Sequence, residues 1–252
     1  MPGIVVYLFV FLFGIVFGSF FNVLIYRLPR GLSIVTPPSS CPSCKGRIGA
    51  RDNIPLLSFL LLKGKCRSCG NPISPRYPLV ELAAGAIFLV SYSFDSMTPL
   101  FVRDTIFYSI LLMVALIDID TRLIPDILSI GGFAVGVFME WILLGKGIRF
   151  PLIGALTGSG ILFLTAVTYE KLTGREGLGM GDVKLLAAVG AFTGYMGSLL
   201  TIFAGSMVGA IIGITLMVKE GKDMKMAIPF GPFLALGAVL ADIFLRNYTI
   251  TF

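Results

Sequence analysis

The sequence predicts an all-α polytopic membrane protein with about eight transmembrane helices and one small cytoplasmic loop domain. Its 252 residues are 56% hydrophobic and only 13% charged, a balance that a soluble domain of this size does not need. Apolar runs of about 17 to 25 residues recur from end to end, and each can cross a hydrocarbon core of about 30 Å. The third observation is one long polar segment after the first apolar run, which contains every cysteine.

The expected spans follow the apolar runs and the glycines and prolines between them. We predict them at 4–26, 79–94, 104–119, 123–144, 151–169, 183–197, 198–218 and 228–245. The first run is interpreted as a retained span, because no basic residue precedes it and no small-residue cleavage site follows it. Gly194 and Gly197 flank the link between the sixth and seventh spans. One broken helix is therefore the alternative to two short spans in that region.

The distribution of lysine and arginine predicts the orientation. Sixteen of the 20 lie in the first loop and in alternate links after it, and four lie on the opposite face. The positive-inside rule therefore places the first loop in the cytoplasm and both termini outside. The net charge of +6 is explained by this topology, so the lipid bilayer is an expected partner and nucleic acid is not. The sequence makes no prediction of the oligomeric state.

We divide the chain into a first transmembrane helix at 1–26, a cytoplasmic tetracysteine loop at 27–78 and a membrane core at 79–252. The loop holds Cys41, Cys44, Cys66 and Cys69. Two CxxC pairs at this separation are typical of zinc ribbons, and Gly46 and Gly70 suit the turns. Four thiolate ligands leave no open position, so the Zn²⁺ is expected to be structural. Two disulfides are the alternative, but cytoplasmic thiols stay reduced.

The chain contains no histidine, which excludes several kinds of catalysis. Ser-His-Asp triads, Cys-His dyads and HExxH zinc proteases all need an imidazole. Carboxylates, lysine, cysteine, a metal or a bound cofactor remain. Two stretches place carboxylates at span ends: "LLMVALIDIDTRLIPDILSI" and "GLGMGDVKLL". Ionisable groups at the edge of hydrocarbon are costly, so they are candidates for function.

Asp118 and Asp182 are the strongest candidates. Asp118 lies in the last turn of a span, where the helix dipole disfavours a negative charge, so capping does not explain it. Asp182 follows Gly179 and Gly181, which permit a tight bend. Two carboxylates that meet share a proton, so one can act as a base on water while the other donates to a scissile carbonyl. The sequence thus predicts aspartyl proteolysis.

The other polar groups near these acids are expected to be supports or interfacial groups. Asp120 adjoins Arg122, and Asp126 begins a span, where a carboxylate favours the helix dipole. Lys184 is expected to support the glycine-rich bend.

Residues 179–182 form a GxGD motif, and together with "DIDTRLIPD" they make the chain resemble bacterial type IV prepilin leader peptidases. The similarity extends to "GSFFNVLIYRLPR", the four cysteines, "ISPRYPLVE" and "IPFGPFLALGA". It implies a bifunctional enzyme of the bacterial inner membrane. Such enzymes cut the basic leader from prepilins and pseudopilins at the cytoplasmic face and then methylate the new N-terminal residue with S-adenosylmethionine. The resemblance assigns catalysis to Asp118 and Asp182. By charge, we expect a basic leader to meet acids such as Asp120, Asp126 and Glu176.

The S-adenosylmethionine site is implied by the resemblance alone, since no glycine-rich fingerprint on a strand-to-helix turn is present. Asn22, Arg27 and Glu81 are weak candidates to line it, and a role as structural anchors is the simpler interpretation of each. Two other functions fit part of the sequence. A presenilin-type or signal-peptide-peptidase-type protease shares the GxGD acid, but it carries a Pro-Ala-Leu element and lacks a tetracysteine loop. A proton-coupled transporter uses buried acids, but it does not explain the cysteines.

Overall fold

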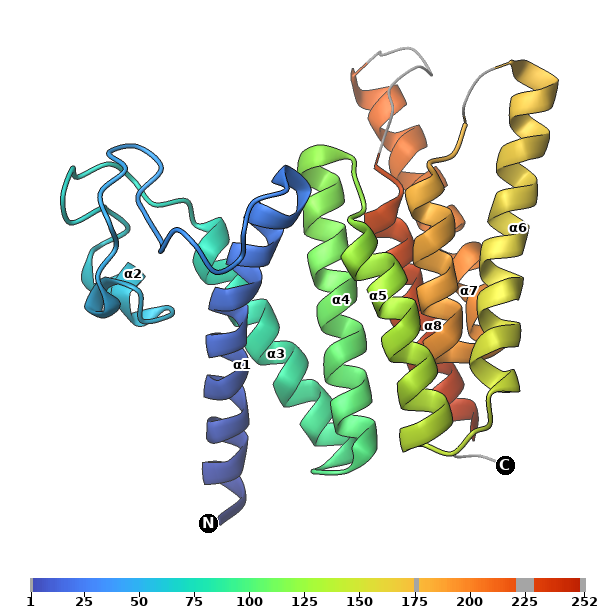
Figure 1. Cartoon of the computed structure of the whole chain (residues 1–252), viewed down its shortest axis with the longest axis horizontal. Coiled ribbons are helices and arrows are strands. Elements are labelled where there is room, and N and C mark those ends of the chain that lie inside the picture. Colours follow the sequence, from blue (N-terminus) through green and yellow to red (C-terminus); the bar gives the residue numbers. More distant parts are fainter. Residues whose placement is uncertain (1, 175–176, 221–228, 250–252) are drawn as a thin grey trace. The chain divides into compact units, whose positions relative to one another are not determined.

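The computed structural model describes residues 2–174, 177–220 and 229–249. These residues form helices and connecting loops (Figure 1), and their strand-like pairings are isolated bridges in the tetracysteine loop. The helices are α1 Pro2–Arg27, η1 Leu28–Arg30, η2 Ala50–Asp52, α2 Leu57–Leu61, α3 Arg76–Asp95, α4 Pro99–Thr121, α5 Asp126–Val137, η3 Phe138–Leu143, α6 Arg149–Thr173, α7 Met180–Glu220 and α8 Gly231–Thr249. The predicted all-α fold class is confirmed.

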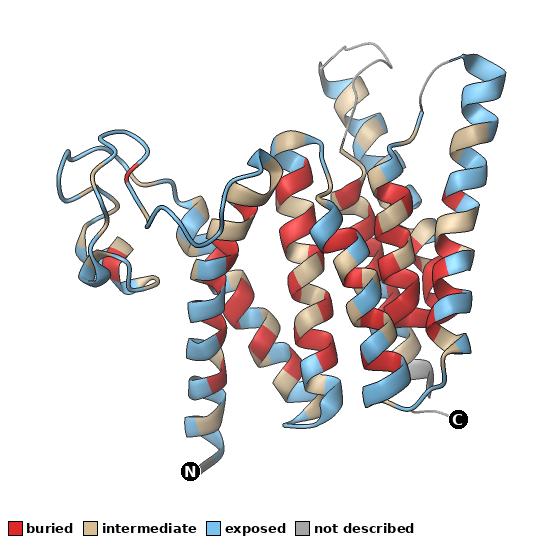
Figure 2. Cartoon of the chain, in the orientation of Figure 1, coloured by how far each residue is buried: buried red, intermediate tan, exposed pale blue. Residues whose placement is uncertain are grey.

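Six helical stretches in the described ranges are long and apolar enough to cross a bilayer. They are Gly3–Arg30, Arg76–Asp95, Pro99–Thr121, Asp126–Leu143, Arg149–Thr173 and Met180–Lys219. The predicted total of eight is not confirmed, because two predicted spans fall within the single run α7 and α8 is not among the six. Many large apolar side chains on these helices are exposed, and Figure 2 shows exposed positions along α1 and α6. Such outward apolar faces are what a lipid environment requires.

The chain divides into two compact units, Met1–Thr105 and Ile106–Phe252. In the first unit α1 and α3 cross at close range. A Cβ atom at Gly18 would lie 2.6 Å from the Cα atom of Glu81. Small residues at such a crossing let two helix backbones approach, so the first unit is built on a tight pair of helices.

In the second unit α7 reverses direction at Gly194, whose φ of 71° and ψ of −173° are not helical. A Cβ atom at Gly158 in α6 would lie 2.9 Å from the oxygen of Leu186 and 3.0 Å from Oγ of Ser198. A straight helix would separate Leu186 and Ser198 by about 18 Å. The two halves of α7 therefore run back along each other, and both ends of α7 lie at the same end of the bundle (Figure 1). The first half is about 21 Å long.

The second half of α7 packs on α8 through small residues. A Cβ atom at Gly205 would lie 2.9 Å from the oxygen of Phe233, and one at Gly209 would lie 3.2 Å from the Phe233 ring. The start of α8 is thereby held at the end of the bundle where α7 begins and ends.

Candidate functional site

Asp118 lies in the last turn of α4 and is 5% exposed. Its Oδ2 atom accepts a hydrogen bond of 2.9 Å from the backbone amide of Gly231, the first residue of α8. A Cβ atom at Gly231 would lie 2.7 Å from the same oxygen. The carboxylate therefore meets the N-terminus of α8, where free backbone amides and the helix dipole favour an anion.

Asp182 lies in the first turn of α7 and is 9% exposed. Its carboxylate hydrogen-bonds with the backbone of Gly179 and is close enough to Asp118 for a direct electrostatic interaction. A Cβ atom at Gly181 would lie 3.2 Å from Cβ of Ile124, in the link between α4 and α5. The glycine-rich bend thus packs on that link, and the two predicted aspartates come together in one buried place.

Apolar residues that neighbour the two carboxylates along α4 and α7 are fully buried. Val114 and Ile117 of α4 and Leu185 and Leu186 of α7 are fully buried at 0% exposure. A buried site of this kind strengthens the electrostatic interaction between charges because the local dielectric is low.

Lys184 does not pair with Asp182. Its Nζ atom lies 2.7 Å from Oδ1 of Asp126, and the two side chains are 40% and 60% exposed. The pair connects α7 to the first residue of α5. Asp120 is exposed on α4, and Glu176 lies outside the described residues. Of the acids singled out from the sequence, Asp118 and Asp182 are the two that the described structure brings together in a buried position.

Sequence reasoning missed Gly231 as part of this site. The signal that could have found it is "FGP", a glycine directly before a proline at a helix start. Proline suits the first turn because that amide has no partner within the helix. The donor is a backbone amide, which does not depend on the type of residue. The sequence therefore could not indicate which acid it would bond to.

The cysteines form a candidate metal centre in the first unit. The sulfur atoms of Cys41, Cys44, Cys66 and Cys69 all lie within 4.8 Å of one another. All four are free thiols in the structure, without a disulfide. Four sulfurs at this separation match the tetrahedral cluster that binds a metal ion.

Each CxxC pair forms the same backbone turn. The amide of Cys41 donates to the oxygen of Gly46 at 2.9 Å, and that of Cys66 donates to the oxygen of Asn71 at 2.8 Å. The left-handed residue that follows the second cysteine is Lys45 in one turn, with a φ of 58°, and Gly70 in the other, with a φ of 72°. The prediction for Gly70 is confirmed.

Gly46 contributes by space rather than by backbone conformation. A Cβ atom there would lie 3.3 Å from Sγ of Cys44. The first turn also favours the thiolate form of Cys41, because backbone hydrogen bonds from Cys44 and Ser43 lower the pKa of its thiol to about 6. Metal ions bind the thiolate form of cysteine.

Comparison with known proteins identifies the family. Residues 105–214 match the type IV leader peptidase family, and residues 12–94 match the bacterial peptidase A24 N-terminal domain. A prepilin leader peptidase/N-methyltransferase of Klebsiella pneumoniae is 45% identical over 194 residues, which cover 74% of this chain and 85% of the relative. The chain belongs to the type IV leader peptidase family. The protein of the same name from Pseudomonas aeruginosa is 35% identical over 265 residues, covering 96% of this chain and 91% of the relative.

A third relative with this name, from Aeromonas hydrophila, is 36% identical over 262 residues, covering 92% of this chain and 88% of the relative. No solved structure matches the chain. Each family match covers one candidate site. The leader peptidase match includes both aspartates, and the N-terminal match includes all four cysteines.

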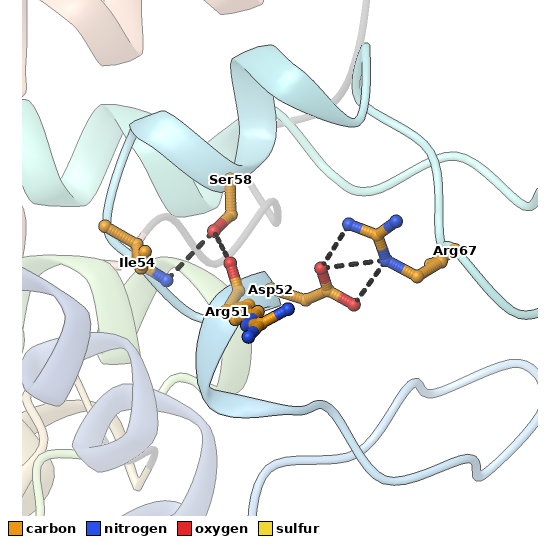
Figure 3. Close-up of polar contacts among 5 residues, drawn as sticks. All are labelled: Arg51, Asp52, Ile54, Ser58 and Arg67. Atoms are coloured by element: carbon orange, nitrogen blue, oxygen red, sulfur yellow. Dashed lines mark hydrogen bonds and ion pairs between the residues drawn. The ribbon is translucent and has the colours of Figure 1, made fainter.

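Within the N-terminal domain of this leader peptidase family member, an ion pair ties the second cysteine turn to η2 (Figure 3). Arg67, between two of the cysteines, places Nε 2.9 Å from both carboxylate oxygens of Asp52 and Nη2 2.7 Å from Oδ1. This partner holds the pKa of the Asp52 carboxyl below its usual range. The Ser58 hydroxyl donates to the oxygen of Arg51 and accepts from the amide of Ile54, both at 2.9 Å.

Two of the candidates for the cofactor site make hydrogen bonds where α1, α3 and the tetracysteine loop meet. Asn22 donates from Nδ2 to the oxygen of Tyr77 at 3.1 Å. Arg27 donates to the oxygens of Ser33 and Pro37 at 2.7 and 2.6 Å. Asn22 therefore joins α1 to the start of α3, and Arg27 holds the start of the loop against the end of α1.

Glu81 has a similar position. It is 7% exposed, lies at the crossing of α1 and α3, and hydrogen-bonds with Ser19. Its Oε2 atom accepts a hydrogen bond of 2.8 Å from the amide of Leu56, directly before α2. The buried carboxylate thus connects the crossing to the middle of the loop.

Proposed function

We propose that this chain is a membrane aspartyl endopeptidase that cleaves the basic leader of type IV prepilins and pseudopilins and then N-methylates the new terminus. The observation that carries the proposal is the shared buried position of Asp118 and Asp182, which lie on different helices. Family membership and the names of relatives that cover most of the chain support the same activity.

In the proposed mechanism Asp118 and Asp182 act as one pair. The ionised carboxyl takes a proton from a water molecule, and the water oxygen forms a bond to the scissile carbonyl carbon while the protonated carboxyl donates to the carbonyl oxygen. The C–N bond then breaks as the leaving nitrogen receives a proton from the pair, and a hydroxyl of the tetrahedral intermediate returns its proton to the pair as the carbonyl re-forms. Gly179 and Gly231 orient one carboxyl each through their backbones, so neither acid needs a side-chain partner for its position.

The cysteine cluster is proposed to hold one structural Zn²⁺ through its four sulfur atoms. A structural zinc contributes folding free energy directly, which suits a loop with few buried apolar residues. Methyl transfer uses S-adenosylmethionine, which supplies an electrophilic methyl group to the new terminal amine. We propose that Asn22, Arg27 and Glu81 affect this second activity by positioning the loop.

The proposed location is the bacterial inner membrane, with the tetracysteine loop and the aspartate pair at the cytoplasmic face and both termini outside. The charge distribution supports this orientation. Reporter enzymes fused to the C-terminus test it: a reporter that folds only outside the cytoplasm is expected to be active, and a fluorescent reporter that is active only inside would contradict the orientation.

The deciding experiment measures leader cleavage by the purified full chain in detergent with a prepilin substrate. Asp118→Asn and Asp182→Asn are each expected to abolish cleavage, since an amide cannot exchange the proton. Asp120→Asn is the matched control, because Asp120 is exposed on the same helix, and it is expected to retain most activity. Cleavage by either of the first two variants would remove that residue from the mechanism.

A separate assay follows methyl transfer from labelled S-adenosylmethionine to a prepilin that has already been cleaved. Cys41→Ser is expected to lose methylation while leader cleavage continues, because the cysteine cluster lies in the other compact unit from the aspartates. Equal loss of both activities would contradict a separate role for the loop.

A further inference from the structure

The tetracysteine loop carries an exposed apolar patch on and beside α2. Leu57, Leu60 and Leu61 are 48%, 70% and 70% exposed, and Ile54 is 45% exposed. Single exposed apolar residues are ordinary, but a contiguous group marks a surface that is covered in use. The patch is made by the run "IPLLSFLLLKGK", from Ile54 to Lys65.

The patch lies level with a part of α1 that precedes its C-terminal end. The amide of Leu56 is bonded to Glu81, which crosses α1 at Gly18. Gly18 is nine positions before Arg27, or about 13 Å from the end of α1, and Glu81 is about 7.5 Å inside the start of α3. Even when the length of the Glu81 side chain is allowed for, the start of α2 lies at the same level as the apolar parts of α1 and α3. In Figure 1 α2 is level with the body of α1.

Residues of α1 at the same level face outward and are apolar. Phe17 is 39% exposed and Phe20 is 45% exposed. The polar anchor Asn22 lies about one turn beyond Gly18 toward the loop, as expected for the boundary between hydrocarbon and headgroups. A segment docked at the level of Gly18 therefore meets lipid.

The charge of the loop indicates which lipid headgroups it would contact. Residues 27–78 contain nine lysines and arginines and one acid, Asp52, which is engaged by Arg67. Lys63 and Lys65 are exposed directly after α2. Basic residues beside an apolar patch are the pattern of segments that lie on anionic membranes.

We propose that residues 54–65 form an interfacial membrane anchor, with the leucines of α2 in the cytoplasmic leaflet and Lys63 and Lys65 among anionic headgroups. Through Glu81 this anchor holds the tetracysteine loop down on the bilayer surface beside α1 and α3. The inference depends on the membrane topology and not on the proteolytic activity.

The test uses the full chain in nanodiscs whose phospholipids carry bromine on the acyl chains, which quenches a tryptophan on contact. Trp141 is the sole tryptophan, so Trp141→Phe gives a silent background. Leu60→Trp in that background is expected to lose a large part of its fluorescence, the response of a side chain at the headgroup and acyl boundary. Ser68→Trp, at an exposed position in the second cysteine turn, is the control and is expected to change little.

Equal quenching at both positions, or none at Leu60→Trp, overturns the proposal. Restoration of Leu60→Trp fluorescence by added prepilin also overturns it, because the patch would then be a substrate surface. Zinc content of each variant checks that the loop has folded. In a further arm, Lys63→Gln with Lys65→Gln is expected to reduce quenching in discs of brominated phosphatidylglycerol and not in discs of brominated phosphatidylcholine. An equal reduction in both lipids would overturn the electrostatic part.

Discussion

At the residue scale, the position of Asp118 depends on a neighbour that has no side chain. The amide of Gly231 bonds to its carboxylate, and the space for a Cβ atom at Gly231 is already taken by that carboxylate. A helix N-terminus can stabilise an anion only when the backbone comes this close. Gly231 is therefore a positioning residue for the proposed reaction.

Gly231→Ala is expected to lower leader cleavage by about tenfold to a hundredfold, because a hydrogen bond to a charged group contributes about 1.5–3 kcal/mol. The loss should appear in kcat rather than KM, since Gly231 contacts the acid and not the leader. Gly131→Ala is the control, because a Cβ atom there meets open space. A variant of Gly231 with unchanged kcat would contradict the positioning role.

Asp52 and Arg67 are expected to protect the second cysteine turn. Asp52→Asn and Arg67→Gln should each make zinc loss to a chelator a few times faster, and the double variant should be no faster than either one, because the two residues act through one contact. The lowered pKa of Asp52 fixes the sign of the pH dependence. The pair stabilises the fold above the unfolded pKa, and the effect disappears as pH falls through the lower folded value. Additive single effects would show that the residues act separately.

At the scale of elements, α7 decides how the second unit is built. Its reversal at Gly194 returns the chain to the end of the bundle where Asp182 lies in the first turn of α7, and it lets α8 start beside Asp118. The reversal is packed closely: a Cβ atom at Gly194 would lie 2.7 Å from the ring of Phe150. Glycine suits this place both for its backbone angles and for its size.

Gly194→Ala is expected to destabilise the protein by about 1–3 kcal/mol from backbone strain, with an added steric cost from Phe150. Thermal unfolding of the purified chain in one detergent measures the change. Gly160→Ala in α6 is the matched control, since a Cβ atom there meets open space, and its Tm should stay close to that of the wild type. Equal Tm values for both variants would contradict the strained reversal.

At the scale of the whole molecule, the chain combines two units with different sources of stability. The second unit buries apolar helix faces against one another, whereas the tetracysteine loop has few buried apolar residues and relies on its cysteine turns, ion pair and anchors. A metal ion is expected to matter for the loop and not for the helices.

Removal of zinc with a strong chelator is therefore expected to open the loop to proteases between 28 and 75, while the helical circular dichroism stays unchanged. Mass spectrometry of the cut sites and a metal assay before and after chelation measure both effects. The Cys44→Ser variant should be cut at the same sites without chelator. Loss of helical signal on chelation would show that the metal also supports the spans.

The sequence by itself determined the properties that depend on local residue patterns. Apolar run length determined the all-α membrane fold, since each span is defined by its own transfer from water to lipid. Cysteine spacing predicted the cluster, and the cost of a charge at the edge of hydrocarbon singled out Asp118 and Asp182. These predictions need no knowledge of which helices are neighbours.

Only the tertiary structure decided the contacts between distant segments. It paired Asp118 with the amide of Gly231, directed Lys184 to Asp126, reversed α7 at Gly194 and left the count of eight spans unconfirmed. It also placed the leucines of α2 level with α1, through the hydrogen bond between Leu56 and Glu81. Such contacts depend on how closely two backbones can approach and where a chain turns back, which are properties of packing between helices and are not encoded in any single stretch of residues.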